Sequence, residues 1–134
     1  MDFWYFDRHE LSSSFIRRTL GGPHGTPERI RVAELDISRF LHEVHARPRA
    51  REGKLLIKLD IEGKEIDVVP DLIEQDALCA ADLVFIEWHT RIFKQAQSST
   101  LARSRAVMRN ASRAFAGMRK KGCKAKILAF DDET

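Results

Sequence analysis

The feature that most constrains the fold is a short apolar run in residues 54–63, KLLIKLDIEG, which ends in two carboxylates and a glycine. Apolar residues crowded into so short a run, interrupted by one lysine, predict a central strand buried on both faces of a covered sheet. Asp60 then lies at the carboxyl end of the strand, Glu62 follows it, and Gly63 permits the chain to turn. Ligands of open α/β sheets bind at this edge. The alternative is that Asp60 and Glu62 only cap a helix that begins near residue 64.

The residues after this run predict a strand, helix, strand unit. Apolar residues recur at helical spacing from residue 66 to residue 78, and Pro70 predicts a kink or the start of a second short helix. A second apolar run, residues 83–86, ends in Glu87, Trp88 and His89. A helical crossover sets the two strands parallel, so we expect Asp60 and Glu87 at the same edge of the sheet.

Four residues at this edge form the candidate catalytic set: Asp60, Glu62, Glu87 and His89. Glu87 and His89 are two residues apart and share a face of an extended chain. Carboxylates and imidazole together can activate a hydroxyl or hold a divalent cation, although the sequence assigns no metal. For His89 alone, the alternative is a partly buried histidine whose ring binds backbone groups.

The rest of the chain completes one α/β domain over residues 28–134. Alternation of apolar and charged residues over residues 29–35 predicts a short strand with one solvent-exposed face. Residues 37–45 predict an amphipathic helix. Residues 98–121 predict the longest helix, and residues 124–130 predict a final strand. Residues 1–27 are rich in turn-forming residues and predict an irregular leader.

Size and composition exclude several classes of protein. The 134 residues fit one domain, and no stretch approaches the ~20 apolar residues that span a bilayer. The aromatic and acidic first residues do not form a signal peptide, so the cytoplasm is the default expectation. Cys79 and Cys123 have no metal-ligand spacing and are either free thiols or one disulfide bridge.

The charge is unevenly distributed along the chain. The net charge is only +3, yet residues 88–130 contain no Asp or Glu. Such segregation can mark a surface for anions or nucleic acid, but a solvated helix face is the favoured interpretation. Nucleic-acid binding is the weaker expectation because no stacking aromatics or known binding motif accompany the arginines of residues 103–121.

Three segments together resemble the FkbM-type methyltransferase domain: KLDIEGKE at residues 58–65, VVPDL at 68–72, and LVFIEWH at 83–89. The resemblance covers residues 30–134 in ordered pieces, including residues 35–41 and the ending from residue 122. It implies a class I, S-adenosylmethionine-dependent enzyme with a Rossmann-like sheet that methylates a hydroxyl of a small molecule or sugar. On this resemblance Asp60 and Glu62 end the fourth strand of the family's sheet, and Glu87 and His89 end the fifth, on the acceptor side of the pocket.

Such enzymes bind the cofactor mainly through a glycine-rich turn after the first strand. The one glycine cluster here, residues 21–25, contains Pro23 and follows no convincing strand, so the cofactor-binding residues are unknown. We therefore expect this chain to form the carboxyl-terminal half of a methyltransferase fold. We expect it to be catalytic only when the other half is supplied. The alternative is a non-catalytic relict or interaction module. An open sheet edge then predicts a homodimer, another covering partner, or residues 1–27 as a substitute strand.

Overall fold

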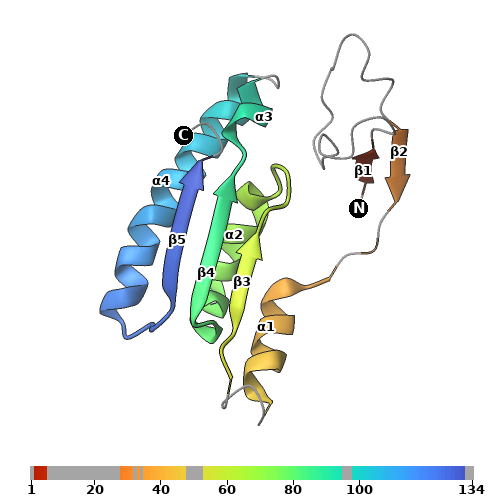
Figure 1. Ribbon diagram of the computed structural model, residues 1–134. Helices are drawn as coiled ribbons and strands as arrows, with labels where there is room; N and C mark the ends of the chain where they lie inside the picture. The colour runs from red at the N-terminus through yellow and green to blue at the C-terminus, as the bar shows by residue number, and fades with distance from the viewer. Residues whose placement is uncertain are drawn as a thin grey trace.

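The computed structural model describes residues 2–5, 28–31, 33, 35–47, 53–94 and 98–131 (Figure 1). Two short strands come first, followed by alternating helices and strands. In chain order the elements are β1 (Asp2–Tyr5), β2 (Glu28–Arg31), α1 (Ile37–Ala46), β3 (Leu56–Leu59), α2 (Glu65–Glu74), the 3-10 helix η3 (Ala77–Ala80), β4 (Leu83–Trp88), α3 (Thr90–Lys94), α4 (Ser98–Lys120) and β5 (Lys126–Asp131).

The main sheet consists of three parallel strands in the order β3, β4, β5. Leu56 pairs with Leu83, and Leu83 pairs with Lys126, so the strands start level with one another. Their carboxyl ends consequently meet at one edge of the sheet, the upper edge in Figure 1. The predicted α/β class, the unit of two parallel strands joined by α2, and the final strand are confirmed. This arrangement is compatible with part of a Rossmann-like sheet.

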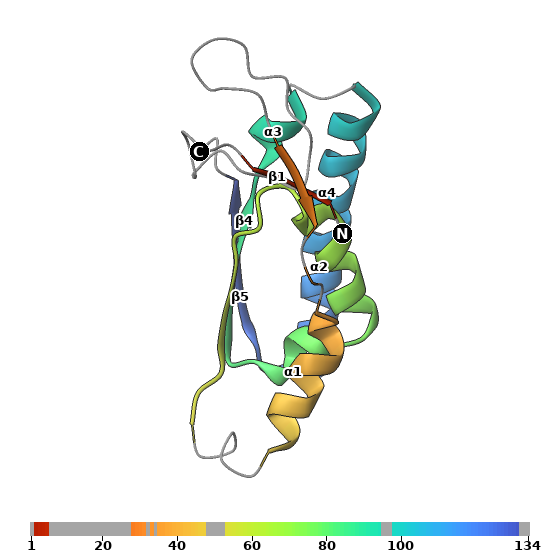
Figure 2. The same cartoon turned by 90° about the vertical axis from the view of Figure 1, so that its right-hand side faces the viewer.

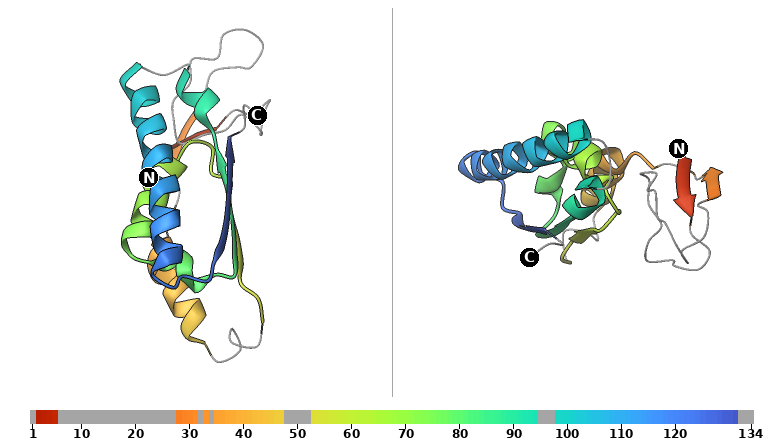
Figure 3. Two further views of the ribbon diagram at one scale, coloured as in Figure 1. Left: turned by 90° about the vertical axis from the view of Figure 1, so that its left-hand side faces the viewer. Right: turned by 90° about the horizontal axis from the view of Figure 1, so that it is seen from above.

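The long helices cover only one face of this sheet. In Figure 2 and in the left view of Figure 3, α1, α2 and α4 all lie on the same side of β3, β4 and β5. Side chains on that side form the core, with Val84 and Ile86 fully buried, whereas Leu56 on the opposite side is 60% exposed. The prediction that this run is a central strand buried on both faces is therefore wrong. Exposed and buried residues alternate along β3, which is an edge strand with one covered face.

Two helices differ from prediction: α3 was not predicted, and α2 differs at Pro70. α1 occupies the predicted residues, and Asp36 caps it by accepting a hydrogen bond from the Arg39 amide at 2.9 Å. A second short helix beginning at Pro70 does not form, because α2 runs through this residue from Glu65 to Glu74. Asp76, before η3, has a left-handed φ of 52°. The helix persists because its inner face, including Val69 and Leu72, is completely buried against the core.

Cys79 and Cys123 are joined in a disulfide, with their Cα atoms 5.2 Å apart. Cys79 belongs to η3, and Cys123 lies in the turn between α4 and β5. The sequence left free thiols and a bridge open as alternatives, and the structure has the bridge. It ties the connection before β4 to the connection before β5.

β1 and β2 form a separate antiparallel pair, in which Asp2 lies opposite Arg31. The right view of Figure 3 shows this pair beside the main body of the chain. β2 is shorter than the strand predicted over residues 29–35, and β1 is a strand inside the segment predicted to be irregular. β1 pairs with β2 and not with the main sheet; residues 6–27 of the predicted leader lie outside the described residues.

Across the described ranges, every helix is too short or too polar to cross a lipid bilayer.

Candidate functional site

The candidate site lies at the carboxyl edge of β3 and β4. Asp60 and Glu62 follow β3, and His89 follows β4. The His89 Nε2 atom is 3.5 Å from Asp60 Oδ1 and 3.6 Å from Glu62 Oε1. One potential ligand atom from each residue lies within 4.8 Å of the other two. The structure therefore brings together three of the four predicted site residues, which we call the His89 cluster.

Glu65, at the start of α2, holds this arrangement in place. Its side chain is completely buried, and Oε1 lies 2.9 Å from His89 Nδ1 while also accepting the Ile61 amide at 2.9 Å. The other oxygen accepts the Gly63 amide at 2.9 Å. A buried carboxylate needs such donors, since an unpaired one costs several kcal/mol. Because Nδ1 of His89 faces Glu65, Nε2 is the ring nitrogen that faces Asp60 and Glu62.

Glu65 is the residue of the candidate site that sequence reasoning missed. It belongs to the KLDIEGKE motif but was not predicted as a site residue. The signal was its place in the first helical turn after a tight turn, where backbone amides need an acceptor. His89 itself is 2% exposed, so it is more deeply buried than predicted, and its ring pairs with the side chain of Glu65.

The turn between β3 and α2 has unusual backbone geometry. Glu62 has a φ of 51° and Gly63 a φ of 99°, both in the left-handed region. A non-glycine residue there costs of order 1–3 kcal/mol unless its surroundings hold it. Glu65 binds the amides on both sides of Glu62 and so provides that restraint. This conformation directs the Glu62 carboxylate to His89.

Lys58 fixes the orientation of Asp60 from the open face of the sheet. Its Nζ atom lies 2.6 Å from Asp60 Oδ2 and 3.5 Å from Glu87 Oε2. The hydrogen bond with Asp60, aided by Glu87, raises the pKa of Lys58 above its usual value, so the side chain remains an ammonium group. Asp60 thus uses one oxygen for Lys58 and presents the other to His89.

Two predictions about these carboxylates need correction. Glu87 lies with Lys58 and is not part of the His89 cluster, because β4 ends at Trp88 and the shared face of an extended chain ends with it. The capping alternative for Asp60 and Glu62 is not borne out either. The amino-terminal cap of α2 is Lys64, which receives no side-chain capping bond.

A hydrogen bond between Thr90 and Asp131 connects the residue after His89 with β5. The Thr90 hydroxyl lies 2.7 Å from both carboxylate oxygens of Asp131, the last residue of β5. Thr90 is 4% exposed and begins α3, directly after His89. The segment that follows His89 is therefore tied to β5.

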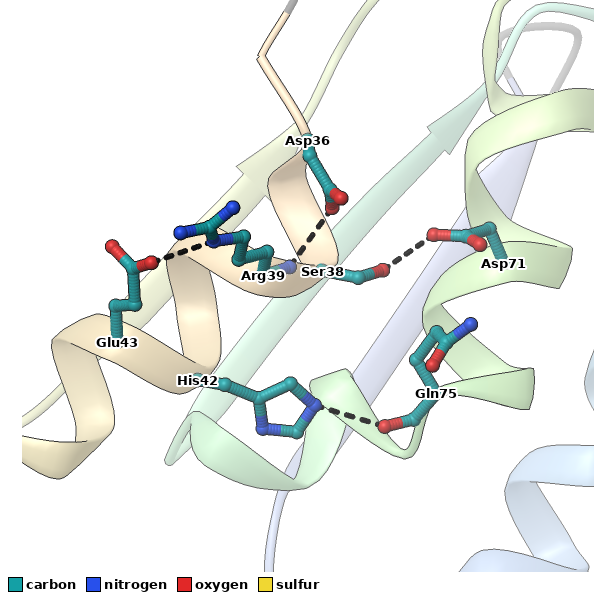
Figure 4. Close-up of a pocket in the computed structure, with 7 residues that line it drawn as sticks. All are labelled: Asp36, Ser38, Arg39, His42, Glu43, Asp71 and Gln75. Atoms are coloured by element: carbon teal, nitrogen blue, oxygen red, sulfur yellow. Dashed lines mark hydrogen bonds and ion pairs between the residues drawn. The ribbon is translucent and has the colours of Figure 1, made fainter.

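Two hollows lie near α1, and their polar groups pair within the protein. The pocket in Figure 4, with a volume of about 360 Å³, lies between α1 and α2. There Ser38 donates to Asp71, and His42 Nε2 lies 2.9 Å from the carbonyl oxygen of Gln75. A larger hollow of about 640 Å³ runs along the open edge of β3 and reaches Lys58. The first is a contact between helices, whereas the second borders the candidate site.

The basic helix α4 contributes one arginine to an internal contact. Arg103 Nη2 lies 2.6 Å from Asp67 Oδ1, and Lys64 Nζ lies 2.8 Å from Asp67 Oδ2. Burial would raise the pKa of Asp67, but the hydrogen bonds from Lys64 and Arg103 lower it below its usual value. Arg103 thus connects α4 with α2.

The fold and the site together define an α/β protein with a histidine and carboxylate cluster at the carboxyl edge of a parallel sheet. No known family model, curated protein or solved structure matches the chain.

Proposed function

We propose that this chain forms the acceptor side of an S-adenosylmethionine-dependent methyltransferase that acts on a hydroxyl of a small molecule or sugar. The KLDIEGKE and LVFIEWH segments that resemble the FkbM-type domain lie on adjacent parallel strands. Their polar residues meet at the edge where open α/β sheets bind ligands. Both points support the proposal.

The observation that carries it is the pair formed by Glu65 and His89. A completely buried carboxylate holds the imidazole by Nδ1, and Nε2 faces Asp60 and Glu62. Proteins arrange buried ionisable groups in this way most often where a proton or a polar ligand must be handled. A purely structural histidine needs only one satisfied nitrogen and no exposed carboxylates in front of the other.

The cluster suits the chemistry of O-methylation. The acceptor oxygen forms a bond to the methyl carbon while the carbon–sulfur bond of the cofactor breaks, and the hydroxyl proton passes to a base. Asp60, 38% exposed, and Glu62, 25% exposed, can accept hydrogen bonds from acceptor hydroxyls, and the cluster can take the proton. Lys58 keeps Asp60 oriented during this step.

The first test is titration calorimetry of the full chain with S-adenosylmethionine and its demethylated product, beside size-exclusion chromatography. Transfer of a labelled methyl group to a panel of sugars and polyols follows. Because the chain forms only the acceptor side, we expect micromolar cofactor binding and measurable transfer from a dimer in which a second copy completes the cofactor site. Asp60→Asn should lower transfer about 100-fold or more, the usual contribution of a positioned base.

Asp60→Asn is preferred to a His89 variant because the Asp60 side chain is partly exposed and the change leaves the core intact. Glu43→Gln on α1 is the matched control, since Glu43 is exposed and pairs only with its helical neighbour Arg39 in the described contacts. Absence of both cofactor binding and methyl transfer would contradict the proposal and favour a non-catalytic interaction module with this fold.

A further inference from the structure

We infer that Asp60, Glu62 and His89 bind a divalent cation of the manganese or zinc type. The inference goes beyond the proposed function, since displacement of a methyl group from sulfur does not itself require a metal. It concerns direct binding, which can be measured without cofactor or acceptor.

The spacing of the donor atoms is the first argument. His89 Nε2 lies 3.5 Å from Asp60 Oδ1 and 3.6 Å from Glu62 Oε1. These separations exceed the about 2.7–2.9 Å of a charge-assisted hydrogen bond. Two donors bound to one ion at about 2.1 Å, and set at a tetrahedral angle, lie about 3.4 Å apart. The distances therefore fit atoms bridged by an ion better than atoms bonded directly.

The second argument is the support behind the histidine. Metal-binding histidines usually donate the other ring nitrogen to a carboxylate, which fixes the ring and raises the basicity of the ligating nitrogen. Glu65 provides this contact at 2.9 Å from His89 Nδ1 and is completely buried. The imidazole is itself 2% exposed and is aimed into the cluster, so the cluster is a built pocket and not a chance group of surface acids.

The third argument is charge. Four carboxylates gather at this edge: Asp60, Glu62, Glu65 and Glu87. Among the described contacts, the ammonium group of Lys58 pairs with Asp60 and Glu87. Lys64 is directed to Asp67, at 2.8 Å. Like charges at such short distances repel one another, and a divalent cation removes this repulsion.

The donor set also indicates which ion binds. One imidazole nitrogen and two carboxylate oxygens suit Mn²⁺ and Zn²⁺, whereas Mg²⁺ and Ca²⁺ prefer oxygen ligands alone. Asp60 and Glu62 are partly exposed, so water can complete the coordination shell and a polar ligand can displace it. The class of ion is thus a transition metal with open positions.

Titration of the purified full chain with Mn²⁺ tests the inference. Binding is measured as the loss of the free-ion signal in electron paramagnetic resonance. We expect one site with micromolar affinity that Zn²⁺ displaces. Asp60→Asn and Glu62→Gln should each weaken binding at least about tenfold, because each removes a ligand charge. Glu43→Gln and His42→Gln, both on α1, are matched controls for an acid and a histidine and should leave the affinity unchanged.

Circular dichroism of each variant confirms that it remains folded. Absence of Mn²⁺ and Zn²⁺ binding, or binding that Asp60→Asn and Glu62→Gln leave unchanged, would overturn the inference; the cluster would then be a histidine charge-paired with carboxylates. The outcome is separable from the methyltransferase proposal. Methyl transfer without ion binding rejects only the cation site, and ion binding without methyl transfer rejects only the proposed activity.

Discussion

At the scale of single residues, the geometry of the site depends on Glu65. Its two oxygens serve the amides of Ile61 and Gly63 and the ring of His89, all at 2.9 Å. This one carboxylate therefore holds the left-handed turn and also sets which nitrogen of His89 faces Asp60. Stability and site geometry are coupled at this position.

Replacing Glu65 with alanine should lower the free energy of unfolding by about 3 kcal/mol or more, because it leaves buried amides and a buried imidazole without their acceptor. Urea unfolding followed by circular dichroism measures this. Glu74→Ala, an exposed position in the last turn of the same helix, is the control and should change stability by less than about 0.5 kcal/mol. Equal effects of the two changes would show that Glu65 does not anchor the turn.

At the scale of elements, local pattern predicted where helices and strands lie but not what covers them. Apolar residues at helical spacing were enough to predict α1 and the long helix α4. The covered face of β3 was mispredicted because Leu56 resembles Ile57 in a sequence, although only Ile57 meets the helices. The helix is not interrupted at Pro70 because tertiary packing of α2 outweighs the missing hydrogen bond.

The same limit explains the candidate site. Asp60, Glu62 and His89 follow apolar runs, and parallel pairing brings them together as predicted. The contact between Glu65 and His89 that holds them could not be predicted from the sequence. It joins residues 24 positions apart and depends on a turn of unusual backbone conformation. Glu87 was misplaced since the end of a strand at Trp88 has no local signal.

The contact between α2 and α4 should make stability depend on pH. The pKa of Asp67 is lower in the folded chain than its ordinary value of 3.8, so its contribution is complete above that value and disappears as the pH falls through the folded pKa. Asp67→Asn should cost less than about 1 kcal/mol at pH 7, because Arg103 and Asp67 are 60% and 35% exposed.

Urea unfolding of wild type and Asp67→Asn at pH 7, 5 and 3 measures the difference. We expect the difference in unfolding free energy between wild type and Asp67→Asn to be similar at pH 7 and pH 5 and smaller at pH 3. Glu74→Gln on the same helix is the control. A gap of constant size down to pH 3 would show that the charge of Asp67 contributes nothing to the contact.

At the scale of the whole molecule, the covalent link between η3 and the turn before β5 joins distant parts of the chain. Cys79 and Cys123 are 44 residues apart, and the segment between them contains β4, α3 and α4. Closing a loop of this size restricts the unfolded chain and stabilises the folded one by about 2–4 kcal/mol.

The double variant Cys79→Ser, Cys123→Ser should therefore lose about 2–4 kcal/mol of unfolding free energy, measured in guanidinium chloride at fixed pH. A phosphine reductant should shift the wild type by a similar amount and leave the double variant unaffected. An unchanged midpoint in the double variant would mean that the bridge does not constrain the unfolded chain.

Helices cover only one face of the main sheet, so mutations on its two faces should differ in their effect on stability. Ile86 is fully buried under the helices, whereas Leu128 and Phe130 on β5 are 38% and 44% exposed. Ile86→Ala should cost about 2–5 kcal/mol, but Leu128→Ser and Phe130→Ser should each cost less than about 1 kcal/mol in dilute solution. Urea unfolding at two protein concentrations, together with analytical ultracentrifugation, shows whether the exposed face is open, covered by a second copy, or covered by another part of the chain. A cost at Leu128 and Phe130 that grows with concentration would indicate a homodimer formed across this face, whereas the sequence predicted one at the open sheet edge. A large cost that does not depend on concentration would show that another part of the same chain covers it, contrary to a sheet with one open face.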